Sequence, residues 1–122
     1  MLQLRSILVA ADNSGARKLR LVNMPGYSKK HTASLGEIVD AVVLEATPEA
    51  PIKKGDKVKV VVVRTRKEKK RPDGSYIRFS DNAGVVVNPQ GVPVATRIFG
   101  PVAMEVKEKG FNKIASLAKE VV

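Results

Sequence analysis

The chain has 122 residues, a formal net charge of +10 and no cysteine. This length suits one domain over residues 1–122, which would bury about two-thirds of the unfolded chain's surface without help from a metal or a disulfide. The missing cysteines exclude thiol chemistry, iron–sulfur clusters and zinc–thiolate sites. No apolar run approaches the roughly 20 residues of a membrane span, and residues 1–13 lack a signal-peptide core. We therefore expect a cytosolic protein without a membrane partner.

The positive charge favours a polyanionic partner over a small anionic substrate. The isoelectric point is near 10.1, and nucleic acid is the leading candidate for such a protein. Aromatic residues make up only 4% of the chain and tryptophan is absent, which leaves few rings on which unpaired bases could stack. The composition therefore favours recognition of the backbone and shape of folded RNA.

The N-terminal part of the chain predicts a β-hairpin. Residues 6–11 form a short apolar run, residues 12–15 have the composition of a turn, and residues 17–23 alternate between apolar and polar side chains. In this alternation Leu19 and Leu21 face the core, and the basic residues between them face outward. The hairpin explains the turn residues without a catalytic role.

A basic loop and a second long strand follow. Residues 24–35 show little periodicity and contain the only histidine, His31, which has no nearby partner at metal-ligand spacing. Residues 36–47 are apolar on both faces, as in a central strand or one that bends around a barrel corner. Within them Asp40 is expected to be paired or to face an edge. The prolines and glycine of residues 48–56 then predict a loop.

Residues 57–82 are the stretch around which the chain is organised. An alternating strand over residues 57–64 leads into residues 64–71, of which six of eight are Lys or Arg. Residues 72–74 are a Pro-Asp-Gly turn, and residues 76–79 alternate again, which predicts a hairpin arm over about residues 64–78. Such charge density repels itself unless a polyanion neutralises it, although a solvated, flexible hairpin tip is the alternative interpretation.

The rest of the chain predicts short strands and then short helices. Residues 83–88 form another strand, and residues 96–99 a last extended piece. Short strands separated by glycine and proline indicate a closed barrel or a sandwich. Only the tail, about residues 102–122, changes period: it predicts a brief helix over residues 102–110 and a second over residues 111–121.

Nothing in the sequence supports catalysis. The acids are scattered at turns, no phosphate-binding glycine loop has the usual spacing, and the histidine stands alone. We expect a protein that is not an enzyme and that uses no cofactor or metal.

Several motifs, in order and with similar spacing, carry a family resemblance along the whole chain. They are ADNSGAR at 11–17, KKGD at 53–56, VVVRT at 61–65, RPDGS at 71–75, IRF at 77–79, Asp-Asn-Ala at 81–83, TRIFGPV at 96–102 and SLA at 116–118. Through them the chain resembles the family of bacterial large-subunit ribosomal protein fourteen.

This resemblance implies a small closed five-stranded β-barrel with a projecting basic hairpin and short C-terminal helices. The family binds large-subunit rRNA beside large-subunit proteins three and nineteen, forms intersubunit bridges with small-subunit rRNA and receives a ribosome-silencing factor. The residues that match its bridge and silencing-factor surface are Thr96, Arg97 and Lys113. The chain departs from the usual arginine, glycine, arginine and proline of the family at Val94, Ala95, Met104 and Lys119.

Two groups of cations are predicted to neutralise rRNA phosphates. The group on the arm comprises Arg64, Arg66, Lys67, Lys69, Lys70, Arg71 and Arg78. A second basic surface comprises Arg17, Lys18, Arg20, Lys29, Lys30, Lys53 and Lys54.

Two other classes of protein remain open from the residues. One is a free RNA chaperone or translation factor that exchanges on and off its target. The other is a protein-docking module that uses its C-terminal face, with the basic arm as a bystander. Reversing the charges of Lys69, Lys70 and Arg71 to glutamate would abolish RNA association in the RNA-binding classes and leave partner binding intact in the docking module.

Overall fold

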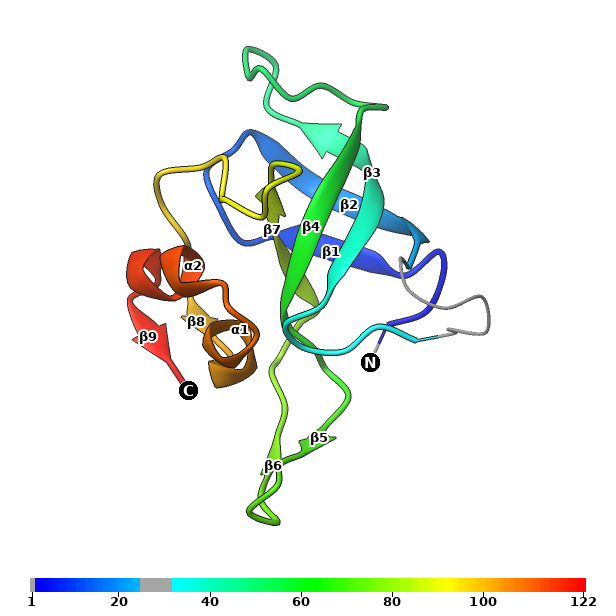
Figure 1. The fold of residues 1–122 in the computed structure, drawn as a ribbon. Helices are drawn as coiled ribbons and strands as arrows, with labels where there is room; N and C mark the ends of the chain where they lie inside the picture. Colours follow the sequence, from blue (N-terminus) through cyan, green and yellow to red (C-terminus); the bar gives the residue numbers. More distant parts are fainter. Residues whose placement is uncertain (1, 25–31) are drawn as a thin grey trace.

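Five strands close into a barrel in the computed structural model, which describes residues 2–24 and 32–122 (Figure 1). They are β1 (Ile7–Ala10), β2 (Ala16–Asn23), β3 (Ile38–Ala46), β4 (Lys57–Arg64) and β7 (Ala83–Val87). The pairs β1–β2, β2–β3, β3–β4 and β4–β7 are antiparallel, and a parallel β7–β1 pair closes the ring. The predicted five-stranded barrel and its first hairpin are confirmed.

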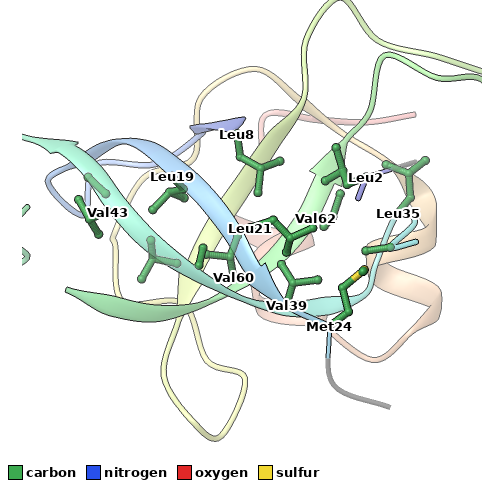
Figure 2. Close-up of a cluster of buried hydrophobic side chains, with 14 of the residues drawn as sticks. Leu2, Leu8, Leu19, Leu21, Met24, Leu35, Val39, Val43, Val60 and Val62 are labelled. Carbon is green, nitrogen blue, oxygen red and sulfur yellow. The ribbon is translucent and has the colours of Figure 1, made fainter. Parts of the chain in front are cut away.

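The barrel is filled by aliphatic side chains from all around the ring (Figure 2). Leu19 and Leu21 of β2 are fully buried, which confirms their predicted orientation. They pack in one cluster with Leu8, Val39 and Val60 from the neighbouring strands. Because burying one such side chain is worth roughly 1.5–3 kcal/mol, this cluster is the main source of the barrel's stability.

The wall formed by β4 and β7 is buried on both faces. Val60 and Val62 point into the barrel cluster, whereas Val61 and Val63 belong to a second cluster on the outside of the wall. The second cluster is covered by the C-terminal segment, and its members there include Ile98, Val102, Val106 and Ile114. Alternation along one strand thus joins two cores, one inside the barrel and one beneath the tail.

Two glycines allow close packing at this wall. A Cβ on Gly84 of β7 would overlap the Val60 side chain inside the barrel. Gly36, just before β3, has a φ of +82°, and a Cβ there would lie 2.9 Å from the carbonyl oxygen of Glu105. Glycine therefore lets the C-terminal segment rest directly on the backbone at the edge of the barrel.

The C-terminal segment holds the helices α1 (Met104–Glu108) and α2 (Asn112–Leu117). The prediction that the second helix continues to residue 121 is wrong, because Ala118 is extended and β9 (Glu120–Val121) pairs in parallel with β8 (Pro101–Val102). Instead of forming a ladder, residues 96–99 make one bridge, from Ile98 to Asp12. No helix in the described part of the chain is long and apolar enough to cross a membrane.

The basic stretch forms the predicted hairpin. The strands β5 (Lys69–Lys70) and β6 (Tyr76–Ile77) pair antiparallel and project from one end of the barrel (Figure 1). At the turn Asp73 accepts hydrogen bonds from the backbone N–H and the hydroxyl of Ser75, at 2.9 and 2.7 Å. The Pro-Asp-Gly signal therefore acts as expected for a turn.

Candidate nucleic-acid interface

The two sides of the arm have different surroundings. Lys69 lies opposite Ile77, and Lys70 lies opposite Tyr76. Side chains of directly opposed residues share a face of a two-stranded ribbon. Ile77 packs against the barrel cluster, whereas Tyr76 is 64% exposed. The ribbon therefore turns Lys69 toward the body of the protein and Lys70 toward solvent.

A buried acid on α1 engages the inner side of the arm. The Glu105 side chain is only 8% exposed, and its Oε1 accepts a 2.9 Å hydrogen bond from Nη2 of Arg71. The same Nη2 donates to the main-chain oxygen of Val122 at 2.7 Å. Nζ of Lys69 lies 3.9 Å from Oε2 of Glu105. The structure thus places two predicted RNA ligands, Lys69 and Arg71, in internal ion pairs.

Arg64 braces the base of the arm. Its side chain is 12% exposed, and its Nε lies 3.3 Å from Oδ1 of Asp81, which lies between β6 and β7. Beside it the buried Thr65 accepts a backbone hydrogen bond from Phe79. The Asn82 side chain accepts another from the backbone N–H of Arg66. These contacts fix both ends of the arm, so Arg64 holds the arm in place rather than lying open to solvent.

Four other cations of the arm are exposed. We call them the exposed arm cations, and they are Arg66, Lys67, Lys70 and Arg78. Glu68 lies among them, with Oε1 3.7 Å from Nζ of Lys67. A backbone hydrogen bond and the charge of Lys67 lower the pKa of Glu68, which therefore stays ionised at neutral pH. Positive charge still predominates on this side of the arm.

The predicted second basic surface is divided between separate places. Arg17, Lys18 and Arg20 are exposed on β2, where Nζ of Lys18 lies 3.8 Å from Glu45. Lys53 and Lys54 lie in the loop between β3 and β4, at the end of the barrel away from the arm (Figure 1). The structure does not bring this pair together with the arm cations. The predicted ligands Lys29 and Lys30 lie outside the described residues.

The predicted bridge residues Thr96 and Arg97 are exposed and firmly held. Oδ1 of Asn13 accepts hydrogen bonds from their backbone N–H groups, at 3.1 and 3.0 Å, and its Nδ2 donates to the Thr96 hydroxyl. Asn13 is thus a positioning residue, although the sequence alone marks it only as part of a turn. Lys113 is exposed on α2.

Asp12, next to that clamp, is buried in the barrel wall. Its carboxylate accepts hydrogen bonds from the Ser14 hydroxyl at 2.7 Å and from the Val86 backbone at 2.9 Å. Burial raises the pKa of Asp12, although these hydrogen bonds act against the shift. Asp12 and Ser14 thus connect the first turn to β7 and have a structural role, in agreement with the turn interpretation.

Glu105 is a functional candidate that sequence reasoning missed altogether. In sequence it is one acid among lysines in the first turn of α1, without a motif around it. Its partners come from positions 34 and 36 residues earlier, and only the docked arm brings them together. Within residues 2–24 and 32–122 there is no group of three or more histidine, cysteine or acidic side chains that could hold a metal ion.

The closed barrel carries exposed cations on a braced arm and, within the described residues, no group of side chains that could hold a metal ion. The family model for ribosomal protein L14p/L23e matches residues 1–122, the whole length of the chain. The chain belongs to this family, which confirms the resemblance seen in the sequence. It is therefore a structural, non-enzymatic protein of the large ribosomal subunit and is located in the ribosome, in the cytoplasm.

Proposed function

We propose that this protein binds large-subunit rRNA chiefly through the exposed arm cations. The observation that carries the proposal is that Arg66, Lys67, Lys70 and Arg78 all reach solvent from one braced hairpin, whereas its other basic side chains are turned inward. Lysine and arginine bind phosphate oxygens without reading base identity, so their role is to place the barrel on folded RNA. The function is positioning within the ribosome, not chemistry.

The ring of Tyr76 adds an apolar surface to the same side of the arm. It is 64% exposed and lies directly across the ribbon from Lys70. Arg78 follows two residues later, on the same side of an extended chain. An aromatic ring between two cations can stack on an unpaired base whose phosphates the cations neutralise. We propose Tyr76 as the arm's one contact to a base.

Two further contacts complete the proposal. Arg17, Lys18, Arg20, Lys53 and Lys54 would bind other rRNA segments around the barrel, because they are exposed and basic. Thr96, Arg97 and Lys113 would contribute to bridges with small-subunit rRNA and to silencing-factor docking. Their exposure and the Asn13 clamp support a rigid docking surface. Large-subunit proteins three and nineteen are the proposed protein neighbours, on the strength of the family alone.

The test must use the exposed arm cations, because Lys69 and Arg71 have partners within the protein. Reversing those two charges would place new acids beside Glu105 and unseat the arm, so a loss of RNA binding would have two explanations. A cleaner variant changes Lys67, Lys70 and Arg78 to glutamine. A matched control changes Lys107, Lys109 and Lys119, which are exposed on the C-terminal segment, to glutamine.

The measurement is affinity for protein-free large-subunit rRNA between about 50 and 200 mM salt. The arm variant should bind more weakly, and the slope of log affinity against log salt should shrink by about 0.7–0.9 for each phosphate that is no longer neutralised. The control variant, with the same change in charge, should keep nearly the wild-type slope. Equal losses of affinity in the two variants would show that binding follows net charge and not the arm.

A further inference from the structure

We infer that Glu105 is a positioning residue that locks the arm in its RNA-binding orientation before RNA arrives. The inference rests on the proposed function of the exposed arm cations. It divides the basic arm into two sets with different tasks. Lys69 and Arg71 hold the arm against the body of the protein, and the exposed arm cations are left to bind phosphate.

The lock joins three separate parts of the chain. Arg71 comes from the arm, Glu105 from α1 and Val122 from the C-terminal strand region, and one guanidinium nitrogen donates to both of the latter. Val122 is itself held, because its oxygen accepts from the N–H of Met104 at 2.8 Å and its N–H donates to Val102 at 2.9 Å. The arm is therefore tied to a surface that is already fixed.

The helix that carries Glu105 is also fixed to the barrel. The Glu105 carbonyl lies so close to Gly36 that only glycine fits there. The next residue of α1, Val106, is fully buried in the cluster outside the β4–β7 wall. The carboxylate therefore has little freedom to follow the arm if the arm swings away.

The ion pairs of Glu105 favour the docked arrangement. Oε2 of Glu105 is buried and makes no hydrogen bond within the described residues, and Nζ of Lys69 lies 3.9 Å from it. A carboxylate removed from water needs paired cations to offset its desolvation cost. The docked arm provides two cations, Lys69 and Arg71, and the hydrogen bond from Arg71, and undocking removes all of these contacts.

A preordered arm raises the affinity for RNA, although the lock itself does not touch the RNA. When only a fraction of the free molecules has the arm in the binding orientation, the apparent Kd rises by the inverse of that fraction. Ordering a flexible hairpin during binding would also consume part of the interaction free energy. The lock removes both losses in advance.

The proposed lock and long-range electrostatics predict opposite changes in RNA affinity when Glu105 is replaced. Changing Glu105 to glutamine removes a negative charge from an RNA-binding protein, which by long-range attraction alone should strengthen binding. If the lock operates and only about 1–10% of the variant keeps the arm in place, binding becomes roughly 10- to 100-fold weaker. The matched control is Glu108→Gln, an exposed acid on the same helix that lines the same groove of about 920 Å³ between arm and α1.

The experiment measures the affinity of wild type, Glu105→Gln and Glu108→Gln for protein-free large-subunit rRNA as a function of salt. We expect Glu105→Gln to bind more weakly with an unchanged salt slope, and Glu108→Gln to bind as tightly as wild type or more tightly. If Glu105→Gln binds as well as wild type, or if both variants weaken alike, the inference is overturned. A wild-type affinity that does not depend on salt would instead reject the proposed function.

A second variant guards against a loss of folding in Glu105→Gln. The double variant Arg71→Met, Glu105→Gln removes both partners of the short ion pair, and its fold is checked by circular dichroism. If Arg71 acts only within the protein, through Glu105 and Val122, the double variant keeps the salt slope of Glu105→Gln. A further drop in affinity, with a slope smaller by about 0.7–0.9, would make Arg71 a phosphate ligand and overturn the division of tasks.

Discussion

The barrel and the arm are held together by different forces. The barrel is closed by five strands around a cluster of aliphatic side chains, and β4 is buried on both faces. The arm has a ladder of only two residue pairs. Backbone hydrogen bonds and the packing of Ile77 and Phe79 hold its base, and ion pairs of Arg64, Lys69 and Arg71 contribute to its orientation. Partly buried ion pairs such as these are screened by salt much less than exposed ones. The protein thus combines an apolar barrel with an arm whose orientation depends in part on ion pairs.

The largest effect on stability is expected from the barrel core. Changing Leu21 to alanine removes a fully buried side chain of β2 and leaves a cavity. The free energy of unfolding should fall by about 2–5 kcal/mol, measured by urea unfolding. The neighbouring control Val22→Ala, at an exposed position, should change it by less than about 0.5 kcal/mol. Equal effects at the two positions would contradict the assignment of the core to the barrel interior.

Overfilling the barrel should have the next largest effect. A methyl group on Gly84 would overlap Val60 across the β4–β7 pair. Gly84→Ala should therefore lower the free energy of unfolding by about 1–3 kcal/mol. Gly74→Ala in the arm is the contrast, because a Cβ there has no atom within 4 Å and only its φ of +90° is unfavourable. An unchanged free energy of unfolding in Gly84→Ala would show that the β4–β7 wall can shift to make room for the methyl group.

A change on the arm should alter RNA affinity and leave the barrel stable. Replacing Tyr76 by alanine removes the exposed ring, and a stacked base is worth about 1–3 kcal/mol. The affinity for large-subunit rRNA should fall accordingly, whereas the free energy of urea unfolding should stay within about 0.5 kcal/mol of wild type. Tyr76→Phe keeps the ring and should bind nearly as wild type does. If phenylalanine is as harmful as alanine, the hydroxyl and not the ring makes the contact.

The smallest effect concerns a polar contact of Asp40, which lies on the outer face of β3 because its neighbours Val39 and Ala41 face the barrel interior. Burial acts to raise the pKa of Asp40, but hydrogen bonds from Asn23 and Lys59, at 3.1 and 3.2 Å, outweigh it and lower the pKa below the ordinary 3.8. A carboxyl with a lowered folded pKa stabilises the fold above its unfolded pKa and loses this contribution as pH falls through the folded value. The stability difference between wild type and Asp40→Asn should therefore shrink below pH 3.8.

The contribution of Asp12 to stability changes with pH in the opposite direction to that of Asp40. Its pKa is raised by burial, so its contribution is fully present below pH 3.8 and declines as pH rises through its folded pKa. Urea unfolding of wild type and Asp40→Asn at several pH values separates the two acids, because only the Asp40 contribution is absent from the variant. A difference that does not depend on pH would show that the Asp40 carboxylate is not held by Asn23 and Lys59.

The sequence predicts the barrel well because its strands follow local rules. Leu19 and Leu21 alternate with charged residues, so the period of the pattern predicts a strand and the face that it buries. The Pro-Asp-Gly sequence favours a tight turn, so its residues predict where the arm reverses direction. The β8–β9 pair could not be predicted, because each strand has only two residues. The pair forms only when the end of the C-terminal segment folds back onto its first residues. Short ladders of this kind follow from tertiary packing, not from local propensity.

The functional division of the arm could not be predicted for a similar reason. Lysines and arginines in a run look alike, and alternation places Arg64 with the valines before it without saying what it contacts. The inward cations are identified only by partners that are distant in sequence, Asp81 for Arg64 and Glu105 for Arg71. Charge density therefore predicts a binding arm, and only the fold distinguishes the cations that remain available to RNA.

The order of the arm in the free protein tests the account most directly. Backbone amide relaxation measured by ¹⁵N NMR without RNA would compare residues 69–77 with the strands of the barrel. A locked arm predicts order parameters near about 0.85 in both regions, with Glu105→Gln lowering only those of the arm. Values below about 0.6 along the wild-type arm would show that it is flexible until RNA binds, and would contradict the account.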